Sequence, residues 1–110
     1  MITIYLLLVF QTMPNLSARG NQFELNGKRF EASYQINRYD DHIWLIIKGK
    51  ETISEVMKLE RVIEHELDLM YIYSRGNELT VFIFKQEYIL MNRGSMTIKY
   101  YYDWQVERLN

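Results

Sequence analysis

The sequence predicts an α+β fold: an antiparallel sheet of about seven strands, arranged as a sandwich or partly open barrel, with one amphipathic helix mid-chain. Nine tyrosines and a single proline in 110 residues favour strands. Asn26-Gly27 stands between two alternating runs, which is typical of a tight hairpin turn. From Glu51 to Asp68 the apolar residues recur at helical spacing. The length indicates a single domain over residues 1–110.

Composition and charge exclude several functional classes. The formal net charge of −1 provides no general excess of cations for nucleic acid or an anionic membrane. The chain has no cysteine, which excludes disulfides, thiolate zinc sites, iron–sulfur clusters and cysteine nucleophiles. The many Ile, Lys, Asn, Tyr and Phe residues are typical of an AT-rich genome, which indicates a bacterial or phage origin.

The first ten residues, MITIYLLLVF, are the most apolar stretch. They resemble either a cleaved secretory signal or a core strand buried on both faces. No Lys or Arg precedes the run, and it is far shorter than the roughly 20 residues that a membrane-spanning helix needs. These features favour a core strand, so we expect a cytoplasmic protein that does not bind membranes. Residues 11–22, which are polar and contain the proline, are expected to form an irregular connection.

Strands are expected on both sides of the central helix. The arm after Asn26-Gly27 alternates, and the polar turn at 39–42 precedes a β-branched and aromatic strand at 43–48. Glycine-containing turns at 74–77 and 92–95 divide the last third into hairpins. Their expected strands cover residues 69–73, 79–84, 88–91 and 96–102.

The central helix is expected from one apolar stripe and a start signal. Ile53, Val56, Met57, Ile63 and Leu67 fall on one side of a helical wheel. Thr52 followed by Glu55 fits a capping box.

Two histidines are the only candidates for imidazole chemistry. His42 follows Asp40 and Asp41, a group that could bind a cation, although Asp-Asp is common in hairpin turns and a turn is favoured. His65 has usable ligand spacing only with Asp68, and two ligands do not make a zinc site. No nucleophile elbow or phosphate-binding glycine-rich loop occurs. We therefore predict no metal, no cofactor and no catalytic residue, and an enzyme is disfavoured.

Glu60 falls in the middle of the expected apolar stripe. It would either pair with an arginine such as Arg29 or Arg38, which is favoured, or be a buried acid with a raised pKa beside a pocket. Glu60, Glu64 and Asp68 also belong to an acidic stripe that could steer a basic partner, although a solvated helix face has the same pattern.

The tyrosine run near the end is a candidate contact surface. In a strand, Ile98, Tyr100, Tyr102 and Trp104 share one face, and Tyr101 lies on the other. Residues 79–84 are apolar on both faces, which one helix cannot cover, so we expect a second layer or a second chain. Tyr100, Tyr101, Tyr102 and Trp104 are the predicted binding residues, because tyrosine and tryptophan are enriched in interfaces. Nucleic acid is disfavoured, because nearby acids nearly cancel the cations.

The leading hypothesis is a small non-enzymatic module that binds another protein or a second copy of itself. An inhibitor or accessory protein of phage or bacterial origin fits this size. It would act through the aromatic sheet face or the acidic helix. The alternative is a barrel that binds a small molecule, or an enzyme, with a pocket near Glu60.

Overall fold

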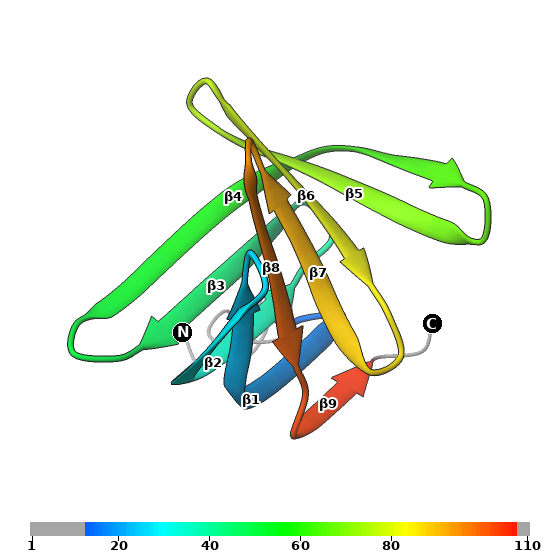
Figure 1. Ribbon diagram of the computed structural model, residues 1–110. Coiled ribbons are helices and arrows are strands. Elements are labelled where there is room, and N and C mark those ends of the chain that lie inside the picture. Colours follow the sequence, from blue (N-terminus) through cyan, green and yellow to red (C-terminus); the bar gives the residue numbers. More distant parts are fainter. Residues whose placement is uncertain (1–12, 108–110) are drawn as a thin grey trace, which may run out of the picture.

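The computed structural model describes residues 13–107, and in this range it contains nine strands and no helix (Figure 1). The bounds are β1 (Leu16–Leu25), β2 (Lys28–Arg38), β3 (His42–Lys48), β4 (Thr52–His65), β5 (Asp68–Arg75), β6 (Glu78–Phe84), β7 (Tyr88–Arg93), β8 (Met96–Tyr101) and β9 (Trp104–Glu107). The antiparallel sheet agrees with the prediction, but the α+β class is wrong. The expected core strand at residues 1–10 lies outside the described residues.

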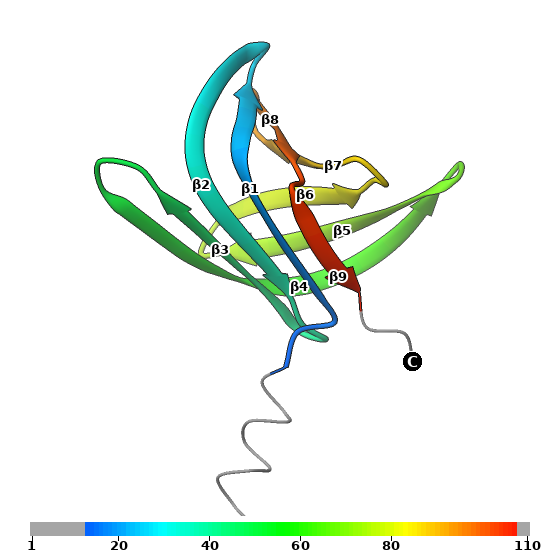
Figure 2. The same cartoon turned by 90° about the horizontal axis from the view of Figure 1, so that it is seen from below.

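The strands form one closed antiparallel barrel. From β1 to β8 each strand pairs with the next, and β8 returns to pair with β1 at Gln22–Leu25 (Figure 2). The first part of β1, Leu16–Arg19, pairs instead with β9. Two short strands in series therefore cover one edge of β1. In residues 13–107 there is no helix long and apolar enough to cross a membrane.

The predicted helix at 51–68 is instead β4 and the start of β5. Three features hide the strand period in the sequence. Glu55 points into the barrel, where an apolar residue would be expected, because it pairs with Arg93. The register of β4 shifts between Leu59 and Arg61, which reverses the alternation halfway along the strand. The turn at Glu66 contains no Gly, Asn or Pro to signal it.

The start of β1 was also predicted wrongly. Leu16, Ala18 and Gly20 are buried at alternate positions, within the stretch expected to be an irregular connection. The small size of Ala18 and Gly20 conceals the alternation. The Asn26-Gly27 turn is confirmed: it joins β1 to β2 with φ of 49° and 89° at the two residues. The turns before β3, β6 and β8 are also confirmed.

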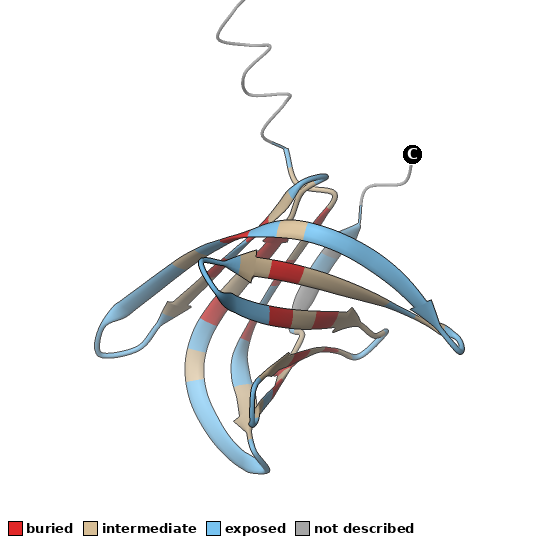
Figure 3. Ribbon diagram, turned by 90° about the horizontal axis from the view of Figure 1, so that it is seen from above, coloured by how far each residue is buried: buried red, intermediate tan, exposed pale blue. Residues whose placement is uncertain are grey.

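The barrel interior is filled by aromatic and aliphatic side chains. Tyr34, Tyr73, Phe82 and Tyr100 are at most 2% exposed, and buried positions alternate with outward ones along the strands (Figure 3). The Tyr34 and Tyr100 rings lie 5.0 Å apart, and the Tyr73 and Phe82 rings pack edge to face at 5.5 Å. Gly20 lets the Tyr34 hydroxyl donate to the carbonyl of Tyr101, because a Cβ at Gly20 would clash with both residues. Open space is therefore found towards the ends of the barrel.

Candidate ligand site at the Arg38 mouth

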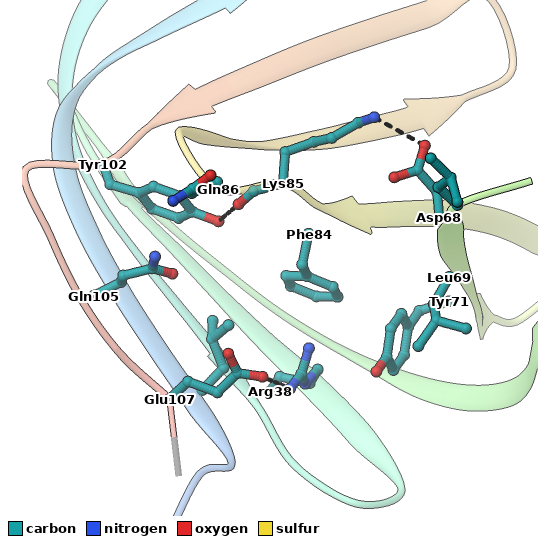
Figure 4. A pocket seen from close by; sticks show the side chains of 12 residues that line it. Arg38, Asp68, Leu69, Tyr71, Phe84, Lys85, Gln86, Tyr102, Gln105 and Glu107 are labelled. Carbon is teal, nitrogen blue, oxygen red and sulfur yellow. Dashed lines mark hydrogen bonds and ion pairs between the residues drawn. The ribbon is translucent and has the colours of Figure 1, made fainter. Parts of the chain in front are cut away.

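One end of the barrel is hollowed into a cavity of about 430 Å³ (Figure 4). This end, named the Arg38 mouth, is where β1, β5 and β9 meet the ends of β2 and β6. The lining residues are Leu16, Arg38, Leu67, Asp68, Leu69, Tyr71, Phe84, Lys85, Gln86, Tyr102, Gln105 and Glu107. Six of these side chains are charged or amide groups and six are aliphatic or aromatic, so the cavity is a partly polar recess with the volume of a small-molecule site.

Arg38 is the nearly buried cation of the Arg38 mouth, with a side chain 11% exposed. Its guanidinium carbon lies 5.0 Å from the ring centroid of Tyr71 and 4.7 Å from that of Phe84. Both rings attract the cation and fix its position. Among the described residues, Arg38 forms a single ion-pair contact, from Nη2 to Glu107 Oε1 at 3.3 Å, and the Glu107 side chain is 56% exposed. Since guanidinium carries several donors, most of its hydrogen-bonding capacity is left for a ligand.

A second set of polar groups forms the rim of the cavity. Lys85 donates to Asp68 at 2.8 Å, and this hydrogen bond raises the pKa of Lys85. The Tyr102 hydroxyl donates to the carbonyl of Lys85 at 2.8 Å. Burial raises the pKa of Tyr102 to about 12, so this hydroxyl remains a donor at neutral pH. The rim is therefore polar and internally bonded, in contrast to the loosely paired Arg38.

The hydroxyl of one buried tyrosine has no hydrogen-bond partner among the described residues. This residue is Tyr73, which is completely buried. Burial raises the pKa of Tyr73, and the positive charge of Arg38 acts in the opposite direction. A buried hydroxyl without a partner costs about 1–3 kcal/mol. Tyr73 is not among the residues that line the cavity, so this hydroxyl belongs to the core rather than to the candidate site.

The structure separates the residues of the predicted tyrosine surface. Tyr100 is completely buried in the core, and Tyr102 lines the Arg38 mouth. Tyr101 lies on the other face of β8, where it packs 5.9 Å from Tyr88 and donates to Glu24 at 3.1 Å. Trp104 begins β9, and its side chain is outside the description. The predicted sharing of one face by Ile98, Tyr100 and Tyr102 is confirmed.

The acidic residues of the expected helix do not form one stripe. Glu60 is exposed in the bulge of β4 and accepts a hydrogen bond from Ser74, rather than pairing with Arg29 or Arg38. Glu64 is exposed opposite Leu69, and Asp68 is bound to Lys85. Spacing of four residues aligns side chains on a helix, but the bulge sends Glu60 and Glu64 to different faces of the strand.

The two histidines are far from forming a metal centre. His42 contacts Asp41 at 2.6 Å and stacks on Tyr39 at 4.3 Å, in the turn that the sequence predicts. His65 lies opposite Asp68 at the end of β4. In residues 13–107 no three His, Cys, Asp or Glu side chains are grouped so that they could hold a metal ion.

Sequence reasoning did not identify Arg38 as a site residue, although a signal was present. Tyr34, Ile36 and Arg38 occupy alternate positions of one strand, and the first two form the inward face. A charged residue that continues an inward series at a strand end is expected to face the barrel mouth. Comparisons with protein-family models, with curated proteins and with solved structures find no match to this chain. The fold and the site therefore define only its class, an antiparallel barrel with a ligand-sized cavity at one mouth.

Proposed function

We propose that this protein is a non-enzymatic barrel that binds a small organic anion at the Arg38 mouth. The observation that carries the proposal is the arrangement of Arg38, which two rings hold in place while a single weak ion pair neutralises it. This keeps the small-molecule alternative of the sequence but moves its site from Glu60 to Arg38.

The charge of the site supports an anion with an apolar body. A carboxylate on the ligand would replace that of Glu107, which is half exposed and lies at 3.3 Å. Planar guanidinium suits such an exchange, because it can donate two parallel hydrogen bonds to one carboxylate. Tyr71 and Phe84 provide the apolar contact. On binding, Arg38 would therefore exchange its loose contact with Glu107 for two parallel hydrogen bonds to the ligand carboxylate.

Calorimetric titration with benzoate tests this proposal. Arg38→Met keeps the apolar stem but removes the charge, and we expect affinity to fall about tenfold or more, because hydrogen bonds to charged groups are strong. Glu107→Gln removes the competing charge, and we expect affinity to rise about fivefold, the value of an exposed ion pair.

Arg29→Met is the matched control, because Arg29 also stacks on a ring, that of Tyr101, at 5.1 Å but lies outside the Arg38 mouth. Its affinity for benzoate should equal that of the wild type. Equal affinities for the wild type and Arg38→Met would contradict the proposal.

A second candidate function, protein binding, is supported by the outer face of the barrel. Ile63, Met70, Ile83 and Leu90 lie directly opposite one another on β4, β5, β6 and β7. They point outward, since their neighbours along the strands are core residues such as Phe82 and Ile89. Contiguous apolar side chains on an outer face are typical of protein interfaces.

We propose a second copy of the chain as the occupant of this row, because the same apolar row on two copies can pack together about a two-fold axis. Sedimentation equilibrium should then show a dimer for the wild type and a monomer for Ile83→Lys. A wild-type protein that stays monomeric at high concentration would rule out self-association through this row.

A further inference from the structure

The cavity at the Arg38 mouth continues onto a projecting ribbon. β4 pairs with β3 only as far as Lys58, and β5 pairs with β6 only from Met70 onwards. Residues 60–69 therefore form a two-stranded extension of the barrel wall, named the β4–β5 ribbon, whose far end projects in Figure 1. Its inner face follows directly from Tyr71 in the cavity wall.

This inner face is exposed, and its side chains are apolar apart from Glu64, which lies opposite Leu69. Leu69 lies two residues from Tyr71, on the same side of β5, and is 49% exposed. Leu67 in the turn is fully exposed at 102%, and both leucines line the cavity. Val62, opposite Tyr71, is also exposed. Figure 4 shows Leu69 beside Tyr71 in the cavity wall. Together with Leu67, Leu69 forms an apolar track that leads away from the one nearly buried cation of the cavity.

We propose that the ligand is an aliphatic carboxylate whose head group binds Arg38 and whose chain lies along Tyr71, Leu69 and Leu67. This inference rests on the proposed function and names its ligand class. A short anion would satisfy Arg38 but would leave the two leucines in water. A chain of several methylenes covers them, and the hydrophobic effect then adds affinity to the ionic contact. The apolar track and the cation are explained by one amphipathic molecule.

Titration with butyrate, hexanoate, octanoate and decanoate, each kept below the concentration at which it forms micelles, tests the inference. Affinity should rise by up to about fourfold for each methylene that leaves water, and should level off once the chain passes Leu67. Leu69→Ser should reduce this gain, and the loss of affinity should be larger for octanoate and decanoate than for butyrate. Arg38→Met should weaken all four acids by a similar factor.

Leu79→Ser is the matched control, because Leu79 is equally exposed, at 59%, but lies at the opposite end of β6. It should leave the dependence on chain length intact. If affinity does not increase with chain length, or increases equally in Leu69→Ser, the proposal of an aliphatic ligand is overturned. Benzoate binding that depends on Arg38 would in that case still support an anion site. Loss of benzoate and carboxylate binding together would remove both proposals. A dimer that Leu69→Ser dissociates would assign the ribbon to a second copy instead and would overturn the inference.

Discussion

The two ends of the barrel each hold an arginine against a glutamate, but with different geometry. At the Arg93 end, opposite the Arg38 mouth, Arg93 donates to both carboxylate oxygens of Glu55 at 3.1 and 2.8 Å and to the Thr80 hydroxyl at 2.8 Å. Arg75 also donates to Glu55 at 2.9 Å. Arg38, in contrast, makes a single 3.3 Å contact with the half-exposed Glu107.

This difference supports the proposal that Arg38, rather than Arg93, binds a ligand. Bidentate hydrogen bonds use the planar donors of guanidinium fully, so Arg93 has little left to offer. The side chains of Arg93 and Glu55 are only 17% and 13% exposed, which makes them structural partners within the barrel. Arg38 is equally protected from solvent, but rings rather than carboxylates surround it. We infer that the Arg93–Glu55 ion pair closes one end of the barrel, whereas the weaker Arg38–Glu107 contact leaves the other end open for binding.

The largest expected effect is the loss of stability on Arg93→Met. The substitution leaves the carboxylate of Glu55 nearly buried with only Arg75 beside it. We expect the free energy of unfolding in urea to fall by about 3 kcal/mol, the usual cost of breaking a buried pair on one side. Arg38→Met should cost about 1 kcal/mol or less, because its ion pair is partly exposed and apolar Met keeps the ring contacts.

The double variant Glu55→Gln/Arg93→Met controls for the stranded charge. It should recover part of the loss, because no unpaired carboxylate then remains inside the barrel. Equal losses for Arg93→Met and Arg38→Met would contradict the distinction between the two ends.

The comparison also explains how much of the fold could be predicted. Turns containing Asn-Gly or Gly have a local cause, the positive φ at Asn26, Gly27, Gly76 and Gly94, and they were predicted correctly. The closed barrel depends on pairing between β1 and β8, far apart in the chain, for which the sequence has no local signal. β4 was misassigned because the inward Glu55 is satisfied by Arg75 and Arg93, which are 20 and 38 residues away in the sequence. Long-range partners therefore explain the main error.

The candidate site was also predictable only where its cause is local in the sequence. The inward position of Tyr102 was predictable from strand alternation with Ile98 and Tyr100. The position of Arg38 between two rings was not, because Tyr71 and Phe84 come from strands that were predicted but could not be placed beside Arg38 from the sequence. A cation is recognised as ligand-binding only when its neighbours in space are known.

A smaller effect is expected in the pH dependence of stability. Burial raises the pKa of Glu55, but hydrogen bonds and charges from Arg93 and Arg75 outweigh it, so the pKa lies below its ordinary value. As pH falls, Glu55 therefore binds a proton in the unfolded chain before it does so in the folded protein. The stability that Glu55 contributes is present above its pKa in the unfolded chain, and it is lost as pH falls through its pKa in the folded protein. Urea unfolding between about pH 6 and pH 3 should therefore show a flatter pH dependence in Glu55→Gln than in the wild type. An identical slope would show that Glu55 does not stabilise the Arg93 end.

The smallest expected effect concerns the β4–β5 ribbon that borders the open mouth. Glu66 in its turn has φ 57°, a conformation that costs an L-residue roughly 1–2 kcal/mol, whereas glycine adopts it freely. Glycine also gains entropy in the unfolded chain, so we expect Glu66→Gly to raise the free energy of unfolding by only about 0.5–1 kcal/mol. Asn26→Gly at φ 49° is the control and should give less, because asparagine tolerates this region. A loss of stability in Glu66→Gly would mean that the glutamate side chain stabilises the turn. In that case the ribbon would be held by more than its backbone pairing.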